Sequence, residues 1–148
     1  MEANRPFAAS AIIDFGVCSA LFAGERESGD LHLVHPIEGG VLVAVVDALG
    51  HGPEAAVAAA RAVAAVKTYG HEPVLSVLQR CHAALAGGRG VVMNLAALDA
   101  GTRTMTWIGV GNVEGFLLPT GGGTGTRQSL VTRGGIVGSE LPPARVHT

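Results

Sequence analysis

Two aspartates, Asp30 and Asp47, are the residues whose type and spacing best support chemistry in this sequence. Apolar, β-branched segments flank the turn at residues 37–40, which predicts a β-hairpin. If the hairpin is centred in the middle of that turn, the two aspartates are equally far from its centre and face each other. Their Cβ atoms would then lie roughly 5 Å apart on one face of the sheet.

Two carboxylates at that separation repel each other by about 3 kcal/mol at an effective dielectric constant near 20. A shared proton, a basic partner or a metal ion can offset this cost. Sites built from carboxylate, carbonyl and water oxygens favour hard ions such as Mg²⁺ or Mn²⁺. The pairing of Asp30 with Asp47 therefore predicts a divalent metal site.

Simpler roles for each aspartate remain open at this stage. Asp30 follows Gly29 and suits a turn, and Asp47 suits a cap on the turn into the next helix. An odd-numbered loop between the strands would also place the two carboxylates on opposite faces.

The elements that must position the aspartates follow from hydrophobic periodicity and turn residues. Residues 41–46 have no polar position, which is typical of a strand covered on both faces. Pro53 suits the first turn of a helix, and a loop rich in glycine is expected over 120–127 as a flexible connection rather than a phosphate cradle. We expect strands over residues 8–17, 31–36, 41–46, 91–98, 104–110, 113–118 and 128–132. We expect one helix over 53–69 and a second that starts near Pro73 and is stopped by Gly87-Gly88. Strands followed by two helices and further strands predict an α+β domain with an antiparallel sheet.

The composition excludes several classes of protein. The 148 residues suit a single domain, and the net charge of −2, with scattered basic residues, argues against nucleic acid as a partner. The longest apolar run is far too short to cross a membrane, and the N-terminus lacks the pattern of a signal peptide. Cys18 and Cys81 form no CxxC pair, which is typical of a reducing, cytoplasmic location.

Two motifs resemble those of a known family, the bacterial type-2C (PPM) serine/threonine phosphatases of the SpoIIE-like branch. The motifs are Ser28-Gly29-Asp30 and Asp47-Ala48-Leu49-Gly50-His51-Gly52, which resemble the Gly-Asp and Asp-Gly-x-Gly-x-Gly pair of that family. Further short stretches resemble the small stressosome phosphatases of this branch: Gln79-Arg80-Cys81, Arg89-Gly90 and Val110-Gly111-Asn112-Val113. The resemblance covers roughly residues 25–138.

The resemblance implies an α/β/β/α four-layer sandwich with antiparallel sheets and a centre of two Mn²⁺ or Mg²⁺ ions between them. It implies that Asp30 and Asp47 are carboxylate ligands, acting in catalysis through a metal-activated water, and that Ala48 is a ligand through its backbone carbonyl. Ala48 stands where the family usually has glycine. Arg26, four residues before Asp30, is a candidate for binding the substrate phosphate, with a solvated loop charge as the alternative. His51 suits either proton transfer to the leaving serine or an ordinary surface position.

For function, the resemblance implies hydrolysis of phosphoserine or phosphothreonine in the STAS-domain proteins of a stressosome-like complex. The alternative is a catalytically silent module that keeps the fold and docks on the same partners. The family completes its site with later aspartates, whereas the last aspartate of this sequence is Asp99. We therefore expect the domain to be C-terminally incomplete, without its last strands.

Overall fold

A β-hairpin with the predicted register begins the regular structure. The computed structural model describes residues 12–120 and 125–148. Strand β1 (Asp30–Ile37) and strand β2 (Gly40–Ala48) are antiparallel, and Ile37 pairs with Gly40 around a two-residue turn. Gly39 has a φ of 69°, a conformation that glycine adopts without the steric cost of a Cβ atom.

The hairpin is one half of a four-stranded antiparallel sheet in the order β1-β2-β3-β4. Strand β3 (Val91–Asp99) pairs with β2, and β4 (Thr104–Val110) pairs with β3. These strands confirm the predictions for residues 91–98 and 104–110. Downstream, β5 (Phe116–Leu117) and β6 (Gln128–Ser129) form a separate two-stranded sheet, much shorter than the strands predicted there.

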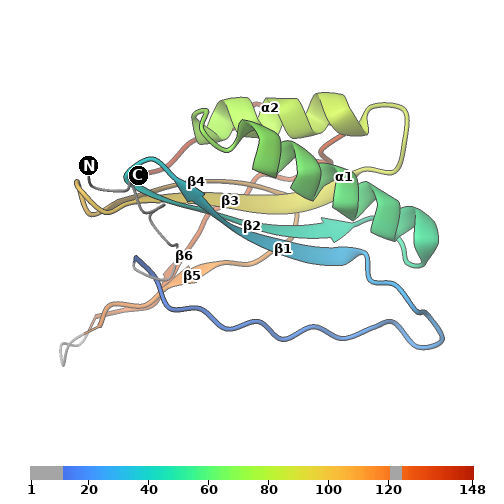
Figure 1. Ribbon diagram of the computed structural model, residues 1–148, viewed down its shortest axis with the longest axis horizontal. Coiled ribbons are helices and arrows are strands. Elements are labelled where there is room, and N and C mark those ends of the chain that lie inside the picture. The colour runs from blue at the N-terminus through green and yellow to red at the C-terminus, as the bar shows by residue number, and fades with distance from the viewer. Residues whose placement is uncertain (1–11, 121–124) are drawn as a thin grey trace, which may run out of the picture.

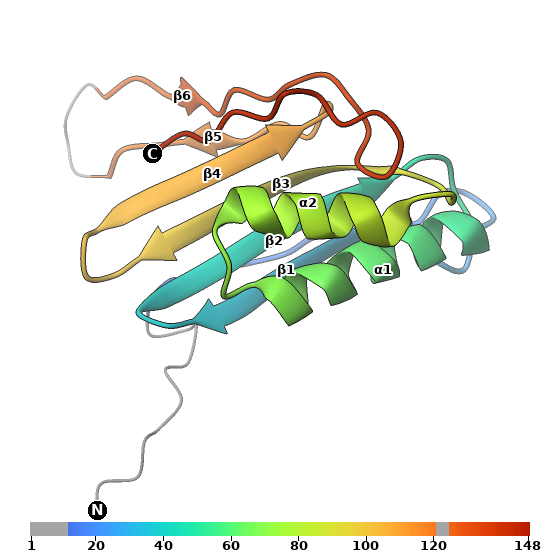
Figure 2. The same ribbon diagram turned by 90° about the horizontal axis from the view of Figure 1, so that it is seen from above.

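Two helices cover one face of the large sheet (Figures 1 and 2). Helix α1 (Pro53–Tyr69) begins at a proline, which suits this position because the missing N–H would have no partner in the first turn. Helix α2 (Val74–Leu85) has Gly87 just beyond its end, with a φ of 78°. Both helices confirm the predicted elements.

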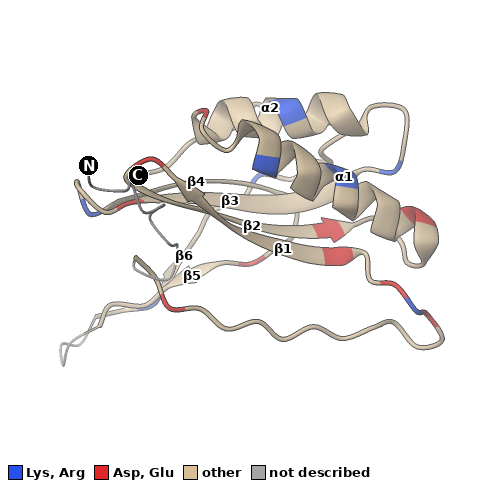
Figure 3. Cartoon of the chain, in the orientation of Figure 1, with Lys and Arg blue, Asp and Glu red and all other residues tan. Residues whose placement is uncertain are grey.

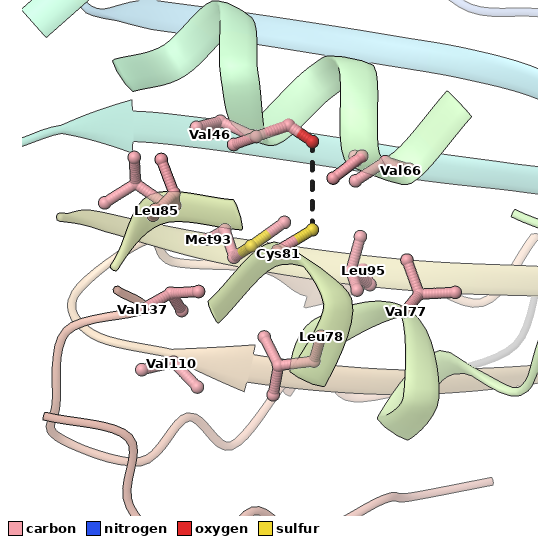
Figure 4. Packing of buried hydrophobic residues seen from close by; sticks show 14 of the residues in the cluster. Val46, Val66, Val77, Leu78, Cys81, Leu85, Met93, Leu95, Val110 and Val137 are labelled. Atoms are coloured by element: carbon pink, nitrogen blue, oxygen red, sulfur yellow. Dashed lines mark hydrogen bonds between the residues drawn. The ribbon is translucent and has the colours of Figure 1, made fainter. Parts of the chain in front are cut away.

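The hydrophobic core lies between the helices and this face of the sheet (Figure 4). Helix α1 contributes mostly alanine, which lets it lie close to the strands, and α2 contributes larger side chains. Leu78 and Cys81 of α2 are fully buried, as are Met93 and Leu95 of β3. The thiol of Cys81 donates a long hydrogen bond (3.7 Å) to the carbonyl of Ala62.

The opposite face of the sheet is only partly covered. Residues 13–22 run beneath it without regular structure, and residues 23–29 turn the chain back into β1 (Figure 1). Strands β5 and β6 lie on the same side, near β4 (Figures 1 and 2). Val45 of β2 is 43% exposed on this face. The prediction that β2 is covered on both faces is confirmed at Val41, which is fully buried, and is wrong at Val45, because the helices shield the other face only.

The predicted strand over residues 8–17 is also wrong in its described part. Residues 12–17 carry no strand, and residues 8–11 lie outside the described residues. A strand requires a hydrogen-bonded neighbour, and neither sheet includes this segment. Residues 121–124 of the predicted glycine-rich loop also lie outside the described residues.

The architecture is α+β, as predicted, with a layer of two helices, a four-stranded antiparallel sheet and part of a second layer. No helix within residues 12–120 and 125–148 combines the length and apolarity needed to cross a membrane. The two candidate site residues, Asp30 and Asp47, lie at the end of the β1–β2 hairpin that is opposite its turn.

Candidate metal centre

Asp30 and Asp47 are direct cross-strand partners, at the first residue of β1 and near the end of β2. Figure 3 shows acidic residues side by side at these two strand ends. Partners in an antiparallel pair project their side chains from the same face of the sheet. Here that face is the one opposite the helices, because the alternate residues Val46 and Ala48 are buried in the core. The predicted face-to-face arrangement of the two carboxylates is confirmed.

The electrostatics of the pair match this geometry. The pKa of Asp47 is raised above its ordinary value, first by desolvation on burial and then by the negative charge of Asp30 and a hydrogen bond with its carboxyl group. Asp47 therefore holds a proton more readily than a free aspartate does. A doubly charged cation between the two groups would remove this penalty.

A cavity of about 330 Å³ contains both carboxylates. The loop before β1 and the turn after β2 form its walls, which include Gly29, Gly50 and His51. Nδ1 of His51 lies 2.6 Å from a carboxylate oxygen of Glu25, so these two side chains join the loop to the turn.

An aromatic contact reinforces the link between the loop and the turn. The ring of His51 stacks on that of Phe22, with centroids 4.5 Å apart and the planes 10° apart. Gly52, at the start of α1, packs so closely that an added Cβ would lie 3.1 Å from both carboxylate oxygens of Glu25. The loop over residues 20–29 is thus held against the start of α1.

Ala48 follows Asp47 in the chain, and its backbone lies beside Gly29, one of the residues that line the same cavity. Its N–H donates to the carbonyl of Gly29 (3.0 Å), and a Cβ built on Gly29 would lie 3.4 Å from the Ala48 carbonyl oxygen. Arg103 is the one non-glycine residue with a positive φ in the described chain, so Ala48 has a backbone conformation that alanine adopts freely. The alanine that replaces the usual glycine thus requires no backbone strain.

The donor atoms of these groups are of the type that a hard divalent cation prefers. Two carboxylates and a nearby backbone carbonyl form an all-oxygen donor set of the type that Mg²⁺ and Mn²⁺ prefer. Within residues 12–120 and 125–148, however, no group of three or more Asp, Glu, His or Cys side chains converges on one point. The described residues would therefore supply only part of such a site.

The sequence of residues 37–148 matches the family described as Stage II sporulation protein E (SpoIIE). The match spans most of the chain, including β2, both helices and the motif that follows Asp47. This chain belongs to the SpoIIE family.

This SpoIIE-family chain is similar in sequence to the phosphoserine phosphatase RsbX of Bacillus subtilis (strain 168). The two are 30% identical over 95 residues, which are 64% of this chain and 47% of RsbX. The chain thus spans about half the length of this relative.

Solved structures agree with the family assignment. One structure comes from work on the bacterial stressosome, described as a modular system that has been adapted to control secondary messenger signalling. It is 32% identical to this chain with a TM-score of 0.77, and the match covers 84% of this chain and 64% of the other. RsbX in complex with magnesium is 25% identical with a TM-score of 0.76, covering 84% of this chain and 61% of RsbX. The SiaA-PP2C domain of Pseudomonas aeruginosa shares the fold, at 18% identity and a TM-score of 0.63 over 81% of this chain and 50% of the domain. The SpoIIE-family chain therefore has the fold of the type-2C phosphatases, in part.

One of the predicted site residues is not brought to the cavity. Arg26 is exposed in the loop before β1 and does not line the cavity that holds Asp30 and Asp47. Its role in binding phosphate stays a prediction.

The structure also adds residues that the sequence did not indicate. Glu25 and Phe22 reach the site through His51, which lies more than 25 residues further along the chain. No spacing rule links residues so far apart, so only the folded loop reveals this contact in the SpoIIE-family chain.

Proposed function

We propose that the protein containing this chain is a metal-dependent phosphatase of phosphoserine and phosphothreonine in proteins. The observation that carries the proposal is the cross-strand pair Asp30–Asp47 in a cavity, on a chain of the SpoIIE family. The similarity to the phosphoserine phosphatase RsbX, and to its structure in complex with magnesium, supports the reaction and the type of cofactor.

In this proposal the residues in and beside the cavity have distinct tasks. Asp30 and Asp47 hold the cation through their carboxylates, and Ala48 adds its backbone carbonyl. Bound Mg²⁺ or Mn²⁺, two ions in the complete site, would supply a water of lowered pKa and neutralise charge on the phosphoryl oxygens. Glu25 orients the ring of His51 at the cavity wall, where an imidazole can move a proton to or from a bound group.

We further propose that the substrates are phosphorylated STAS-domain proteins of a stressosome-like complex in the cytoplasm. The support is the RsbX similarity together with the likeness, at 32% identity, to a structure from work on the bacterial stressosome. Such substrates are folded proteins, so recognition would need a surface beyond the cavity itself.

The test is release of phosphate from a phosphoserine peptide by the full-length gene product, with and without added Mn²⁺. We expect turnover only with the metal, and a loss of kcat/KM of about 100-fold or more for Asp47→Asn, because even residues around a metal's ligands typically contribute 10–100-fold. Asp14→Asn is the matched control, since Asp14 is exposed and does not line the cavity.

The same experiment separates the enzyme from a silent docking module. A full-length product that never releases phosphate, at any Mn²⁺ or Mg²⁺ concentration, yet binds a phosphorylated STAS protein would establish the docking module. Turnover that is identical in Asp47→Asn would contradict the role of the carboxylate pair.

A further inference from the structure

Arg89 connects three segments of the chain beside the candidate metal centre. It lies just before β3, and its Nη1 donates to the carbonyl oxygen of Leu49 at 3.1 Å, in the turn that follows β2. Its Nε donates to Glu54 Oε2 at 2.8 Å, and its Nη2 lies 2.6 Å from the same oxygen, in the first turn of α1. One guanidinium therefore ties the turn after β2 to the start of α1.

The residue after Arg89 holds the other side of Leu49. The N–H of Leu49 donates to the carbonyl of Gly90 at 3.1 Å. Residues 89 and 90 thus bind both the N–H and the C=O of Leu49, which fixes two successive peptide planes of the turn. The guanidinium of Arg89 packs closely against this turn, because a Cβ added at Gly50 would collide with Arg89 Nη1.

The first of these planes carries the carbonyl of Ala48. No peptide bond in the described chain is cis, and in a planar trans peptide the C=O and the following N–H point in opposite directions. Since the N–H of Leu49 points to Gly90, the Ala48 carbonyl points away from Gly90. Gly29, which lines the cavity with the two aspartates, lies beside that oxygen.

From these contacts we infer that Arg89 is a positioning residue that sets the direction of the Ala48 carbonyl for the metal ion. The inference rests on the proposed function, because it concerns the metal site proposed there. Arg89 does not touch the ion; it acts through the backbone of Leu49. Glu54 holds the guanidinium in place, so the fork can donate to the turn and to the helix at the same time.

The planar fork of arginine suits this task better than lysine does. A lysine ammonium is a single point of charge, whereas the guanidinium offers donors in fixed directions to two acceptors. We therefore expect Arg89→Lys to restore only part of what Arg89→Gln loses.

The experiment measures the Kd for Mn²⁺ by titration calorimetry on the full-length gene product, with urea unfolding of the metal-free proteins alongside. Arg89→Gln should raise the Kd about tenfold, in the range typical of residues that orient metal ligands. Arg89→Lys should give a smaller rise. Arg80→Gln is the matched control, because Arg80 of α2 also pairs with a glutamate, Glu72, and does not line the cavity.

Several outcomes decide the matter. Equal urea stability for Arg89→Gln and Arg80→Gln, with weaker Mn²⁺ binding only in the first, supports the positioning role. Wild-type Mn²⁺ affinity in Arg89→Gln overturns it and leaves the proposed function intact, provided that Asp47→Asn still weakens binding. Unchanged affinity in Asp47→Asn overturns the proposed metal site and this inference with it.

A second variant covers the case in which Arg89→Gln does not fold. Glu54→Ala removes the carboxylate that accepts from Nε and Nη2 of Arg89, and so frees the guanidinium from the orientation in which Nη1 reaches the Leu49 carbonyl. Glu54 is 76% exposed, so this change removes no core contact. A Kd for Mn²⁺ raised severalfold supports the inference, and an unchanged Kd overturns it.

Discussion

Asp30 and Asp47 face each other across the β1–β2 hairpin, on the face of the sheet opposite the helices. Their separation along the chain is set by two strands and a two-residue turn. Because strand pairing is rigid, the carboxylates stay together whether or not a cation is present. The metal-free protein therefore carries a repulsion that a bound cation would relieve, and this has consequences that can be measured.

Replacing Asp47 should change stability in opposite directions with and without metal. Asp47→Asn removes one of two facing charges, so the metal-free variant should be more stable than the wild type. Saturating Mn²⁺ should stabilise the wild type, by about 2.7 kcal/mol at one hundred times its Kd, and leave the variant nearly unchanged. Thermal unfolding with and without Mn²⁺ measures both effects. Asp14→Asn should behave as wild type, and a full response to Mn²⁺ in Asp47→Asn would contradict the site.

The pKa of Asp47 predicts how the stability of the metal-free protein depends on pH. Since this pKa is raised in the folded state, the folded protein takes up a proton at a higher pH than the unfolded chain does. Stability is therefore lost as pH rises through the folded pKa of Asp47, and regained as pH falls through it. Compared with Asp47→Asn, the wild type should be less stable at pH 7, and the deficit should shrink towards pH 4.

Urea unfolding of both proteins across this pH range provides the measurement. Titrating groups that lie far from residue 47 are common to the two proteins and largely cancel in the difference. One of them is Asp99, whose pKa is lowered by hydrogen bonds from Thr102. A difference that stays constant from pH 7 to pH 4 would be evidence against a raised pKa of Asp47, whose first cause is burial and whose second is the charge of Asp30.

The packing of α2 predicts a large contrast between two leucines. Leu78 is fully buried against the sheet, whereas Leu75 is 36% exposed on the same helix. Leu78→Ala should lower the free energy of unfolding by about 2–5 kcal/mol, because it removes buried methyl groups and leaves a cavity. Leu75→Ala should cost clearly less. Urea unfolding at pH 7 compares them, and equal losses would show that α2 does not pack as described.

The two cysteines should differ sharply in reactivity. Cys18 is exposed, and Cys81 is buried with the pKa of its thiol raised to about 12, mainly by burial. Only a thiolate reacts with a disulfide reagent at an appreciable rate, so one thiol per chain should react at pH 8 in the native protein. The second should react after addition of urea. Cys18→Ser should abolish the native reaction, and labelling of Cys81 in the folded variant would argue against the core described above.

Local patterns in the sequence were sufficient for the elements that carry the site. A short turn with glycine between two β-rich segments fixes a hairpin register, because strand pairing proceeds residue by residue from the turn. The facing of Asp30 and Asp47 followed from that rule and was confirmed. The helix starting at Pro53 was likewise readable, since its signals lie within a few residues of one another.

Contacts between distant segments were decided only by the tertiary structure. Residues 12–17 have the apolar composition of a strand, but a strand forms only where another strand lies beside it, and the local sequence does not specify that partner. The exposure of Val45 depends in the same way on which layers cover the sheet. The bonds of His51 to Glu25 and of Arg89 to Leu49 join residues that only the packing of loops brings together. Chain order determines which residues can form a hairpin or a helix, whereas the packing of these elements determines which loops meet around the carboxylates.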